Sequence, residues 1–301
     1  MNIVLIDCTP ELNALFDAGT LTVPEGMHIH VGAPTPEQIV SLCRSAHIML
    51  VEHTLVSPET LAACPTLKAI VFMGTGASSY LPMAWLSEHG IAVSTTPGYG
   101  SRAVAEHALA LTFAAARNLG PMLKDIARGG WQPRGGLQLE GRKVAVIGFG
   151  EVGRCYAQMA TALGMDVSIW NRTPVDSPYF EADLNTVLRG AEVVSLHLAL
   201  NPHTTGFLDS ARLRLLKPGA LVINTARAAL IDQAALAQAL YSGQVAHAAL
   251  DVFWQEPMAP NDPWRDVGNV TLTPHAAYMT QEAYLELWKR TLNAAAQYSD
   301  R

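Results

Sequence analysis

The 301-residue sequence has little charge and no excess of positive charge. Only 15% of its residues are charged and 50% are hydrophobic, so a disordered or fibrous chain is excluded. The formal net charge of -6 leaves no basic face with which to neutralise phosphates, and we expect no nucleic-acid partner. The length favours about two domains.

Cysteine is scarce and long apolar runs are absent. Cys8, Cys43, Cys64 and Cys155 lack C-x-x-C spacing, so we expect neither a disulfide framework nor a metal site. The longest apolar run, AVAEHALALTFAAA, is interrupted by Glu-His and falls short of the ~20 residues that a membrane helix needs. The amino terminus, MNIVLIDCTP, has no basic n-region or cleavage site and predicts a strand. These features predict a cytoplasmic protein without a membrane partner.

Short apolar and β-branched runs alternate with helical patterns in two successive series. The first extends from NIVLID (2–7) to LKAIVFM (67–73), and the second from KVAVIGFG (143–150) to NVTLTP (269–274). Such alternation is typical of parallel sheets covered by helices. The predicted fold class is therefore α/β, with two Rossmann-like domains.

The segment between the two series has a different composition. A long Ala/Leu-rich helical pattern precedes Pro121, which is followed by a short helical pattern and the Gly-rich PRGGLQLEGR. We interpret residues 121–141 as an arm that joins two copies into a homodimer, with an ordinary surface connection as the alternative. The final amphipathic pattern, residues 280–299, is suited to pack back onto the first domain.

A glycine motif follows the first strand of the second series. The strand Val144–Ile147 runs directly into Gly148-Phe149-Gly150-Glu151-Val152-Gly153, and a helical pattern follows. Gly148 allows a tight turn, Gly150 lets a pyrophosphate approach the backbone, and Gly153 allows close packing of helix and strand. The amides at the helix start favour phosphates. A glycine-rich turn without a ligand is the alternative, but the strand and helix around it favour a dinucleotide.

The end of the next strand, DVSIW, predicts which dinucleotide binds. NAD-binding versions of this motif carry an acidic residue there, about 20 residues beyond the glycines, which holds the ribose hydroxyls. This sequence has Asn171-Arg172-Thr173, with no carboxylate to repel a 2′-phosphate and a guanidinium to bind one. We therefore expect a preference for NADP(H). The alternative is NAD(H), with Asn171 on the ribose and Arg172 in solvent.

From about Ile91 to its end, the sequence resembles the D-isomer-specific 2-hydroxyacid dehydrogenases. The motifs TTPGYGSRAVAEHALAL, LEGRKVAVIGFGEVGR, VINTARAALIDQAAL, AALDVFWQEP and LTPHAA carry the resemblance, which is closest in type to NADP-dependent glyoxylate/hydroxypyruvate reductases. The resemblance implies a split flavodoxin-like substrate domain, residues 1–97 and 276–301, and an inserted doubly wound dinucleotide-binding domain, residues 98–275. It also implies hydride transfer between NAD(P)H and a small 2-keto acid.

The resemblance identifies three catalytic residues. It places the family's arginine at Arg227 in VINTARAALID, its glutamate at Glu256 in DVFWQEP and its histidine at His275 in LTPHAA. The guanidinium fork suits a planar keto acid. Hydride delivery creates an alkoxide that needs a proton, which a histidine oriented by a carboxylate can donate. Each residue alone fits an ordinary structural role, but the combined motifs favour catalysis.

The resemblance further implies contacts with cofactor and substrate. Asn224, Thr225 and Ala226 would lie near the nicotinamide, Asp251 would bind its carboxamide, and Leu198 and Thr205 would lie along the adenine and phosphate side. The substrate carboxylate would be held by backbone amides of Met73 to Gly76, including Gly74, Thr75 and Gly76. After this loop, Ala77-Ser78-Ser79-Tyr80 replaces the family's Asp-Asn pair, and Gly100 stands where many members have asparagine. The substrate's identity therefore stays open. The rival functions are a phosphoglycerate-type dehydrogenase and a nucleotide-sensing corepressor.

Overall fold

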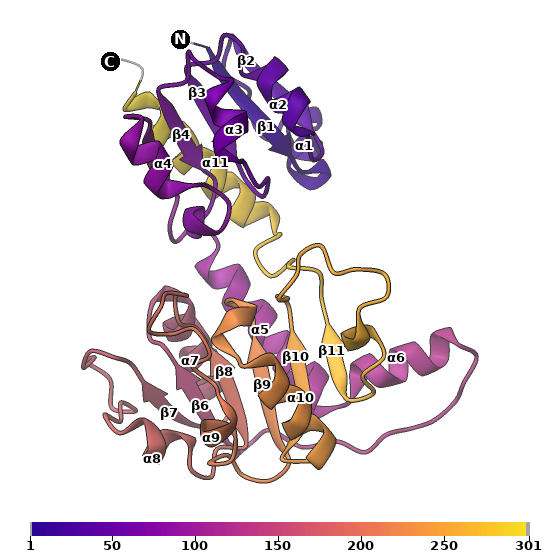
Figure 1. The fold of residues 1–301 in the computed structure, drawn as a ribbon. Helices are drawn as coiled ribbons and strands as arrows, with labels where there is room; N and C mark the ends of the chain where they lie inside the picture. The colour runs from indigo at the N-terminus through magenta and orange to yellow at the C-terminus, as the bar shows by residue number, and fades with distance from the viewer. Residues whose placement is uncertain (1, 299–301) are drawn as a thin grey trace. The chain divides into compact units, whose positions relative to one another are not determined.

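The computed structural model describes residues 2–298, and the chain divides into two compact units (Figure 1). Unit 1 combines Met1–Gly100 with Met279–Arg301, and unit 2 is Ser101–Tyr278. The domain limits predicted from the sequence, 97/98 and 275/276, lie close to both junctions. Each unit contains one parallel sheet with helices on both faces, so the predicted α/β fold class is confirmed.

Unit 1 holds a five-stranded parallel sheet with the strand order β2-β1-β3-β4-β5. Its strands are β1 (Ile3–Cys8), β2 (Met27–Val31), β3 (Ile48–Val51), β4 (Ala69–Phe72) and β5 (Ala92–Thr95). Its helices are α1 (Pro10–Asp17), α2 (Pro36–Leu42), α3 (Pro58–Ala62), η1 (Ala77–Ser79), α4 (Met83–Glu88) and α11 (Gln281–Ala296). The first three begin with proline after a Thr or Ser whose hydroxyl accepts a backbone N–H, which is a strong helix-start signal.

The helix from the end of the chain, α11, completes unit 1 by packing on β4 and β5. Leu287 on its apolar face is fully buried. The ring of Trp288 meets Phe16 edge-on at 4.9 Å, and its Nε1 donates to the carbonyl of Thr22 at 3.0 Å. The amphipathic helix predicted for this segment therefore belongs to the first unit, as its pattern suggested.

Unit 2 holds a six-stranded parallel sheet with the order β11-β10-β9-β8-β6-β7. Its strands are β6 (Lys143–Ile147), β7 (Asp166–Trp170), β8 (Val193–Leu196), β9 (Ala220–Asn224), β10 (Val245–Leu250) and β11 (Val270–Leu272). Its helices are α5 (Ser101–Ala116), α6 (Leu119–Ala127), α7 (Glu151–Ala162), α8 (Leu184–Leu188), α9 (Ser210–Leu213), η2 (Ala228–Leu230), α10 (Gln233–Ser242) and η3 (Pro263–Arg265). The strand order reverses at β6, which makes the sheet doubly wound and places a ligand crevice at the carboxyl end of β6.

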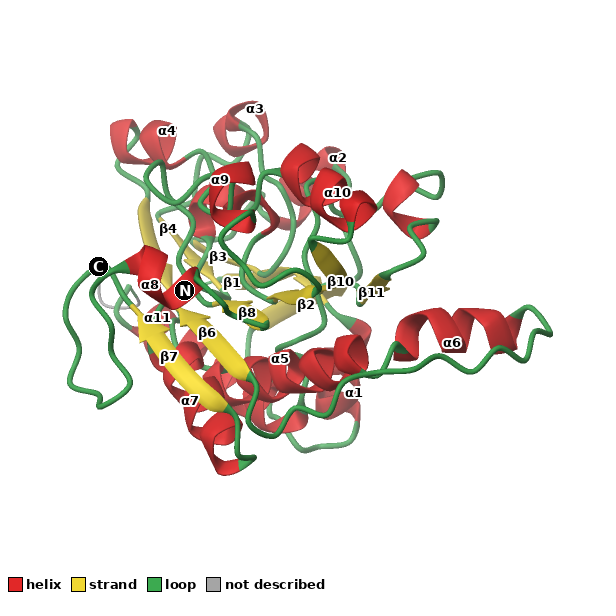
Figure 2. Ribbon diagram, turned by 90° about the horizontal axis from the view of Figure 1, so that it is seen from below, coloured by secondary structure: helices red, strands yellow, loops and turns green. Residues whose placement is uncertain are grey.

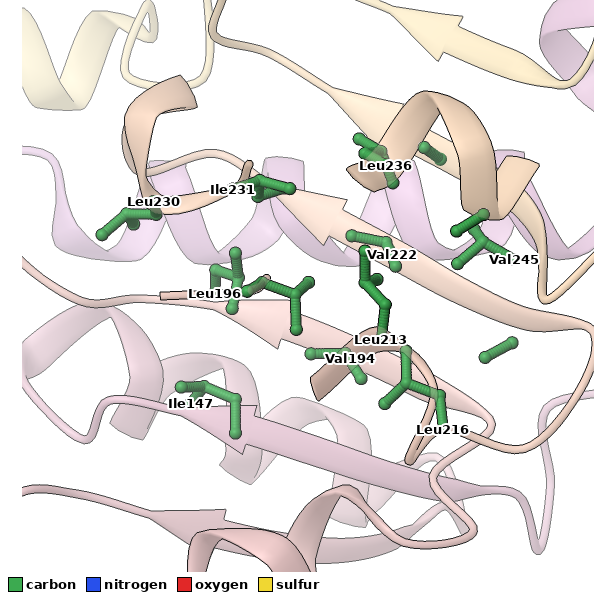
Figure 3. Packing of buried hydrophobic residues seen from close by; sticks show 14 of the residues in the cluster. Ile147, Val194, Leu196, Leu213, Leu216, Val222, Leu230, Ile231, Leu236 and Val245 are labelled. Atoms are coloured by element: carbon green, nitrogen blue, oxygen red, sulfur yellow. The ribbon is translucent and has the colours of Figure 1, made fainter. Parts of the chain in front are cut away.

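Both faces of this sheet are buried, because strand residues alternate in direction. Val144 and Val146 contribute to the core beneath α5 and α7, whereas Ile147 points into the opposite core. Figure 3 shows this second core, where Val222 packs among leucines from α9, α10 and the turns beside them. Apolar burial on both faces fixes the strand ends that carry the site.

The arm after α5 differs from its predicted form at one point. Helix α6 begins at Leu119, before Pro121, because a proline in the first turn lacks only an N–H that has no intrahelical partner. Figure 2 shows α6 and the loop after it extending away from the sheet of unit 2. Leu123, Ile126 and Trp131 are 69%, 53% and 83% exposed, so the arm presents an apolar surface to solvent.

The four cysteines are free thiols, three of them buried. Across residues 2–298, no group of three or more His, Cys, Asp or Glu side chains is arranged to hold a metal ion. No helix in the same part of the chain is long and apolar enough to cross a membrane.

Candidate active site

The glycine motif lies at the turn from β6 into α7. A Cβ at Gly148, whose φ is +97°, would lie 2.7 Å from the carbonyl oxygen of His197, and one at Gly153 would lie 2.0 Å from the oxygen of Gly148. At Gly150 nothing lies within 4 Å, which leaves open space above the turn. Gly150 caps α7 without a side-chain hydrogen bond, so the first amides of the helix are available to an anion. This turn fits a pyrophosphate.

The other residues of the motif have separate roles. Phe149 and Val152 pack against the core beneath α5 and α7. The exposed Glu151 accepts a hydrogen bond from the hydroxyl of Ser101 at 2.8 Å. They therefore anchor the turn, and the glycines shape it.

The strand end at β7 lies against the glycine turn. Asn171 accepts the N–H of Phe149 through Oδ1 at 3.1 Å and donates through Nδ2 to the carbonyl of Thr173 at 2.9 Å. Arg172 and Thr173 are exposed, and the Arg172 guanidinium has no hydrogen bond or ion pair within residues 2–298. Asn171 thus holds two loops together, and an unpaired cation lies beside them.

The segment after β9 contains a polar group that has no hydrogen-bond partner in the described part of the chain. Asn224 is fully buried, accepting the N–H of Ala226 and donating to the carbonyl of Arg227. The hydroxyl of Thr225 is buried and finds no hydrogen-bond partner in the described part of the chain. A buried unsatisfied group costs about 1–3 kcal/mol, so a ligand that bonds it would be stabilised. The segment fits the polar edge of a nicotinamide.

Two residues predicted for the adenine side differ in their surroundings. A Cβ at Gly148 would lie 3.0 Å from Leu198 Cδ2, which places Leu198 beside the glycine turn. The hydroxyl of Thr205 donates to the carbonyl of Asn201 at 3.0 Å within its own turn. Leu198 therefore lies beside the glycine turn, whereas no hydrogen bond of Thr205 within residues 2–298 joins it to that turn.

The three residues predicted for catalysis come together. His275 Nδ1 lies 2.7 Å from Glu256 Oε2, with 21% and 29% of the two side chains exposed. Burial would raise the pKa of Glu256. The hydrogen bond and charge of His275, the N–H of Phe253 and the charge of Arg227 together bring that pKa below its usual value. Glu256 is therefore ionised and can only accept, so Nδ1 of His275 carries a hydrogen and Nε2 is directed away from the carboxylate.

The loop that carries His275 is held by a buried carboxylate. Asp251, fully buried at the end of β10, accepts the Thr273 hydroxyl at 2.5 Å and the Ala276 amide at 3.0 Å through Oδ1, and the Ala277 amide at 2.9 Å through Oδ2. The sequence predicted Asp251 as a ligand of the carboxamide, with a nearby backbone amide as the alternative partner, and the structure shows two such amides. A carboxylate has about four acceptor positions, so Oδ2 keeps one for a further donor.

Sequence reasoning missed His107 as part of this arrangement. Its Nε2 lies 3.0 Å from the Thr273 hydroxyl and 3.5 Å from Asp251 Oδ1. Because Thr273 donates to the carboxylate, it must accept from His107, and Nε2 therefore carries the hydrogen. The pair His107 and Thr273 lies 166 residues apart in sequence, which no local pattern indicates.

The predicted substrate loop lies at the carboxyl end of β4 in unit 1. The amide of Gly74 donates to the carbonyl of Phe72 at 2.9 Å, and a Cβ at Gly74 would lie 2.8 Å from the Phe72 ring. Gly74 therefore shapes the turn. The amides of Thr75 and Gly76 donate no hydrogen bond within residues 2–298, so both are available to an anion.

A doubly wound sheet with a turn built for pyrophosphate, together with a paired Glu and His and a nearby Arg, defines a nicotinamide-dependent dehydrogenase. The family model "D-isomer specific 2-hydroxyacid dehydrogenase, NAD binding domain" matches residues 109–277. The chain belongs to this family. It is therefore an oxidoreductase that acts on the CH–OH group of a donor.

Relatives and solved structures agree with this assignment. The chain is 33% identical over 259 residues to glycerate dehydrogenase of Methylorubrum extorquens, covering 83% of this chain and 81% of that protein. It is 32% identical over 272 residues to glyoxylate reductase of Aeropyrum pernix, covering 84% and 80%. A solved acyclic imino acid reductase in complex with NADPH and D-Arg superposes with a TM-score of 0.81 at 26% identity, covering 99% and 97%. The chain spans about half the length of the D-3-phosphoglycerate dehydrogenases of Archaeoglobus fulgidus and Mycobacterium tuberculosis, 51% and 49%.

Proposed function

We propose that this protein is an NADPH-preferring reductase of small 2-keto acids of the glyoxylate or hydroxypyruvate type, which it converts to D-2-hydroxy acids. The observation that carries the proposal is the short contact between Glu256 and His275, with Arg227 near enough for its charge to act on Glu256. Relatives named for glycerate and glyoxylate support the substrate class.

The three residues divide the chemistry between them. A bound nicotinamide supplies the hydride that reaches the keto carbon. His275 transfers the Nε2 proton to the oxygen that becomes the hydroxyl, and Glu256 stabilises the imidazolium and fixes the ring orientation. Arg227 binds the carboxylate or polarises the keto oxygen through its planar fork. Asp251 positions the His275 loop through its bonds to Thr273, Ala276 and Ala277.

The cofactor would be held by the strand ends of unit 2. The turn Gly148 to Gly153 takes the pyrophosphate, and the Thr225 hydroxyl and the remaining acceptor position of Asp251 take the nicotinamide edge. Arg172, exposed and unpaired within residues 2–298, takes the 2′-phosphate of NADP(H). A solved relative that holds NADPH supports this choice, with NAD(H) as the weaker cofactor.

We also propose a cytoplasmic homodimer joined through the arm. Leu119, Leu123, Ile126 and Trp131 are all more than one-third exposed on this segment, and apolar side chains exposed together typically mark a protein interface. A second copy of the chain would cover them.

A turnover assay tests the proposed function against its rivals. Oxidation of NADPH and of NADH is followed by absorbance with glyoxylate, with hydroxypyruvate and without a keto acid. We expect turnover with both acids and higher kcat/KM with NADPH. A protein that binds NADPH, seen by fluorescence, yet oxidises none with either acid would be the nucleotide-sensing alternative. Turnover with phosphohydroxypyruvate but not with either small acid would identify the phosphoglycerate-type alternative.

A further inference from the structure

A side chain of helix α5 reaches the loop that carries His275. Helix α5 packs on β10 and β11 (Figure 1). Its His107, whose side chain is 26% exposed, meets the residues that follow these two strands, with Nε2 3.0 Å from the hydroxyl of Thr273 and 3.5 Å from Oδ1 of Asp251. The proposed chemistry assigns no role to His107, although it lies in the same unit as the proposed proton donor.

The hydrogen bonds around Thr273 run in one direction. The Thr273 hydroxyl has a single hydrogen, which it donates to Asp251 Oδ1 at 2.5 Å. The same hydroxyl must then accept at its 3.0 Å contact with His107, so Nε2 of His107 carries a hydrogen. Since a neutral imidazole is protonated on one nitrogen only, neutral His107 is the Nε2–H tautomer.

The hydroxyl of Thr273 takes its orientation from these two side chains. The backbone of Thr273 is committed on both sides, because its amide donates to the carbonyl of Leu250 and its carbonyl accepts the amide of His275, both at 3.0 Å. Donation from His107 occupies the acceptor side of the hydroxyl and leaves its hydrogen directed at Asp251. Hydrogen bonds in a chain polarise one another, so the bond to Asp251 is also strengthened.

Asp251 holds the loop on both sides of His275. Its Oδ1 accepts the hydroxyl of Thr273, which precedes His275. The amides of Ala276 and Ala277, which follow His275, donate to Oδ1 at 3.0 Å and to Oδ2 at 2.9 Å. Two donors fill the acceptor positions of Oδ1 and fix the rotation of the carboxylate. Because His275 has a φ of 54°, which most side chains disfavour, the loop needs these bonds to keep its conformation.

The donated hydrogen distinguishes His107 from a residue that only packs. An apolar side chain at position 107 could fill the same space against β11, but it could not donate. The hydroxyl of Thr273 would then be free to turn away from Asp251, and Oδ1 would keep only the Ala276 amide. The hydrogen on Nε2 is therefore the property of His107 to test.

We propose that His107 is a positioning residue for His275 and acts through Thr273 and Asp251. The relay of hydrogen bonds holds His275 in the geometry in which it transfers a proton to the substrate oxygen. This inference rests on the proposed function, in which His275 is the proton donor. The bonds of the relay involve neither the glycine turn nor Arg172, so its loss should affect the chemical step and not the affinity for NADPH.

The variant His107→Leu removes the donor. With glyoxylate, kcat should fall by a factor of about 10 to 100, since a misplacement of about 1 Å can cost about 100-fold. The Kd for NADPH, measured by fluorescence, should change little. With NADPH deuterated at the transferred position, the isotope effect on kcat should rise, because hydride transfer becomes slow relative to product release. His107→Gln, whose amide can donate, should recover most of kcat.

Thr273→Val tests the route of the effect, because valine has the shape of threonine without the hydroxyl. This variant should lower kcat by about the same factor as His107→Leu, and the double variant should be no slower than either single variant. His28→Leu, at an exposed histidine on β2, is the control and should keep full activity. Losses that add in the double variant would mean that His107 acts by packing, which overturns the relay.

A spectroscopic measurement tests the relay without turnover. The ¹⁵N chemical shifts of His107 in the labelled enzyme, assigned through bonds from its backbone, should show a protonated Nε2. An unprotonated Nε2 overturns the relay even if the variants do not fold. An unchanged kcat in folded His107→Leu overturns the positioning role alone. Failure of the unmodified enzyme to reduce any 2-keto acid defeats the proposed function and the role in proton transfer, whereas the tautomer of His107 would still stand.

Discussion

Among single residues, His275 combines its chemistry with an unusual backbone conformation. Its φ of 54° lies in the left-handed region, where asparagine is tolerated better than most side chains, and its amide donates to the carbonyl of Asp251 at 2.7 Å. His275→Asn should therefore preserve the loop while removing the proposed proton donor. We expect NADPH binding to be unchanged by fluorescence titration and kcat to fall by a factor of about 10²–10⁴.

The control for this variant is His28→Asn, which replaces an exposed histidine on β2 and should behave like the unmodified enzyme. Turnover by His275→Asn close to that of the control would remove His275 from the mechanism. Loss of NADPH binding would show instead that the substitution disturbs the fold of the loop.

The variant Arg227→Lys tests whether substrate binding needs only the positive charge of this side chain or also its planar shape. Its Nη1 donates to the carbonyl of Ala226 at 2.7 Å, which orients the guanidinium. Lysine keeps the charge but has no planar fork, so Arg227→Lys should lower kcat/KM for glyoxylate by at least about 10-fold. Steady-state kinetics measure this, with Arg214→Lys at an exposed position as control. Equal kinetics for the two variants would exclude a bidentate contact by Arg227.

Under the proposed function, cofactor preference depends on Arg172. A charge-assisted contact with the 2′-phosphate in an exposed position corresponds to about 10- to 40-fold in kcat/KM, after solvent screening. Arg172→Ala should lose that factor with NADPH and little with NADH, and adding Asn171→Asp should favour NADH further. Aspartate can still accept the Phe149 amide that Asn171 binds, so the turn should stay intact. Higher kcat/KM with NADH in the unmodified enzyme contradicts the proposed preference.

At the residue scale, short motifs predict site residues that lie next to one another in the chain. Gly148 and Gly153 were predictable because they lie in a short pattern with a known chemical reason, whereas Glu256 and His275 were identified through the family resemblance of the motifs that contain them. The bonds of Asp251, the partnership of His107 with Thr273 and the second role of Asn171 join strand ends that are distant in sequence. The packing of the sheet determines these partners, and no short stretch of the sequence contains both members of such a pair.

At the scale of elements, one carboxylate ties together the amino ends of three strands in unit 2. Glu192, just before β8, accepts Arg142 Nη1 at 2.8 Å and Lys217 Nζ at 2.6 Å, from the segments before β6 and β9. Burial would raise the pKa of Glu192, but these two hydrogen bonds and the amide of Lys143 lower it to about 2. The ion pairs therefore hold together the amino ends of β6, β8 and β9, at the end of the sheet opposite the glycine turn.

Glu192 predicts a pH dependence of stability. Because its pKa is lower in the folded than in the unfolded chain, its contribution is fully present above about pH 4.5 and is lost as the pH falls toward 2. The side chains of Arg142 and Lys217 are 35% and 54% exposed, so we discount the shift for solvent and expect about 1–2 kcal/mol. Denaturant unfolding of Glu192→Gln should show this loss at pH 7 and a smaller one near pH 3.

The control is Asp176→Asn, an exposed carboxylate in the same unit that should leave stability unchanged at both pH values. If Glu192→Gln lowers the free energy of unfolding by the same amount at pH 7 and pH 3, packing and not charge accounts for the loss of stability.

The elements themselves were largely predictable, and the exceptions have physical causes. Capped starts such as Thr35 with Pro36 and the continuous apolar run in β6 determine helix and strand locally. The start of α6 was misplaced, because proline was read as a boundary although the first helical turn accepts it. Outside the six strands of unit 2, Ile169 forms a single parallel bridge with Phe180, which is too short to give a strand pattern in the sequence.

For the molecule as a whole, the arm predicts the oligomeric state. Light scattering at micromolar concentration should give twice the chain mass of 32.3 kDa. The double variant Leu123→Asp, Trp131→Asp should give a single chain mass, because it places charge in the apolar surface that a partner would cover. Tyr241→Asp, at a side chain 89% exposed on α10, is the control and should stay dimeric. A single chain mass for the unmodified protein would refute the dimer.

The two-unit organisation was foreseen at this scale because two α/β series and a returning helix can be read directly from the pattern. The substrate could not be foreseen in the same way. The loop that carries Thr75 and Gly76 is held by hydrogen bonds from the Met73 amide to Val51 and from the Thr96 amide to Gly74, and the strand order, not the local sequence, brings these partners together.

Helix α11 completes unit 1 by packing on its sheet, although the strands of that sheet lie almost the whole chain before it. This order has a consequence for synthesis. A ribosome delivers residues 2–100 before unit 2, but helix α11, which packs on β4 and β5, emerges only after all of unit 2. At ~5–20 residues per second this leaves the sheet face bare for roughly 10 to 40 seconds, while unit 2 has everything it needs to fold. During this interval the exposed sheet of unit 1 is the part of the nascent chain most vulnerable to aggregation and proteolysis.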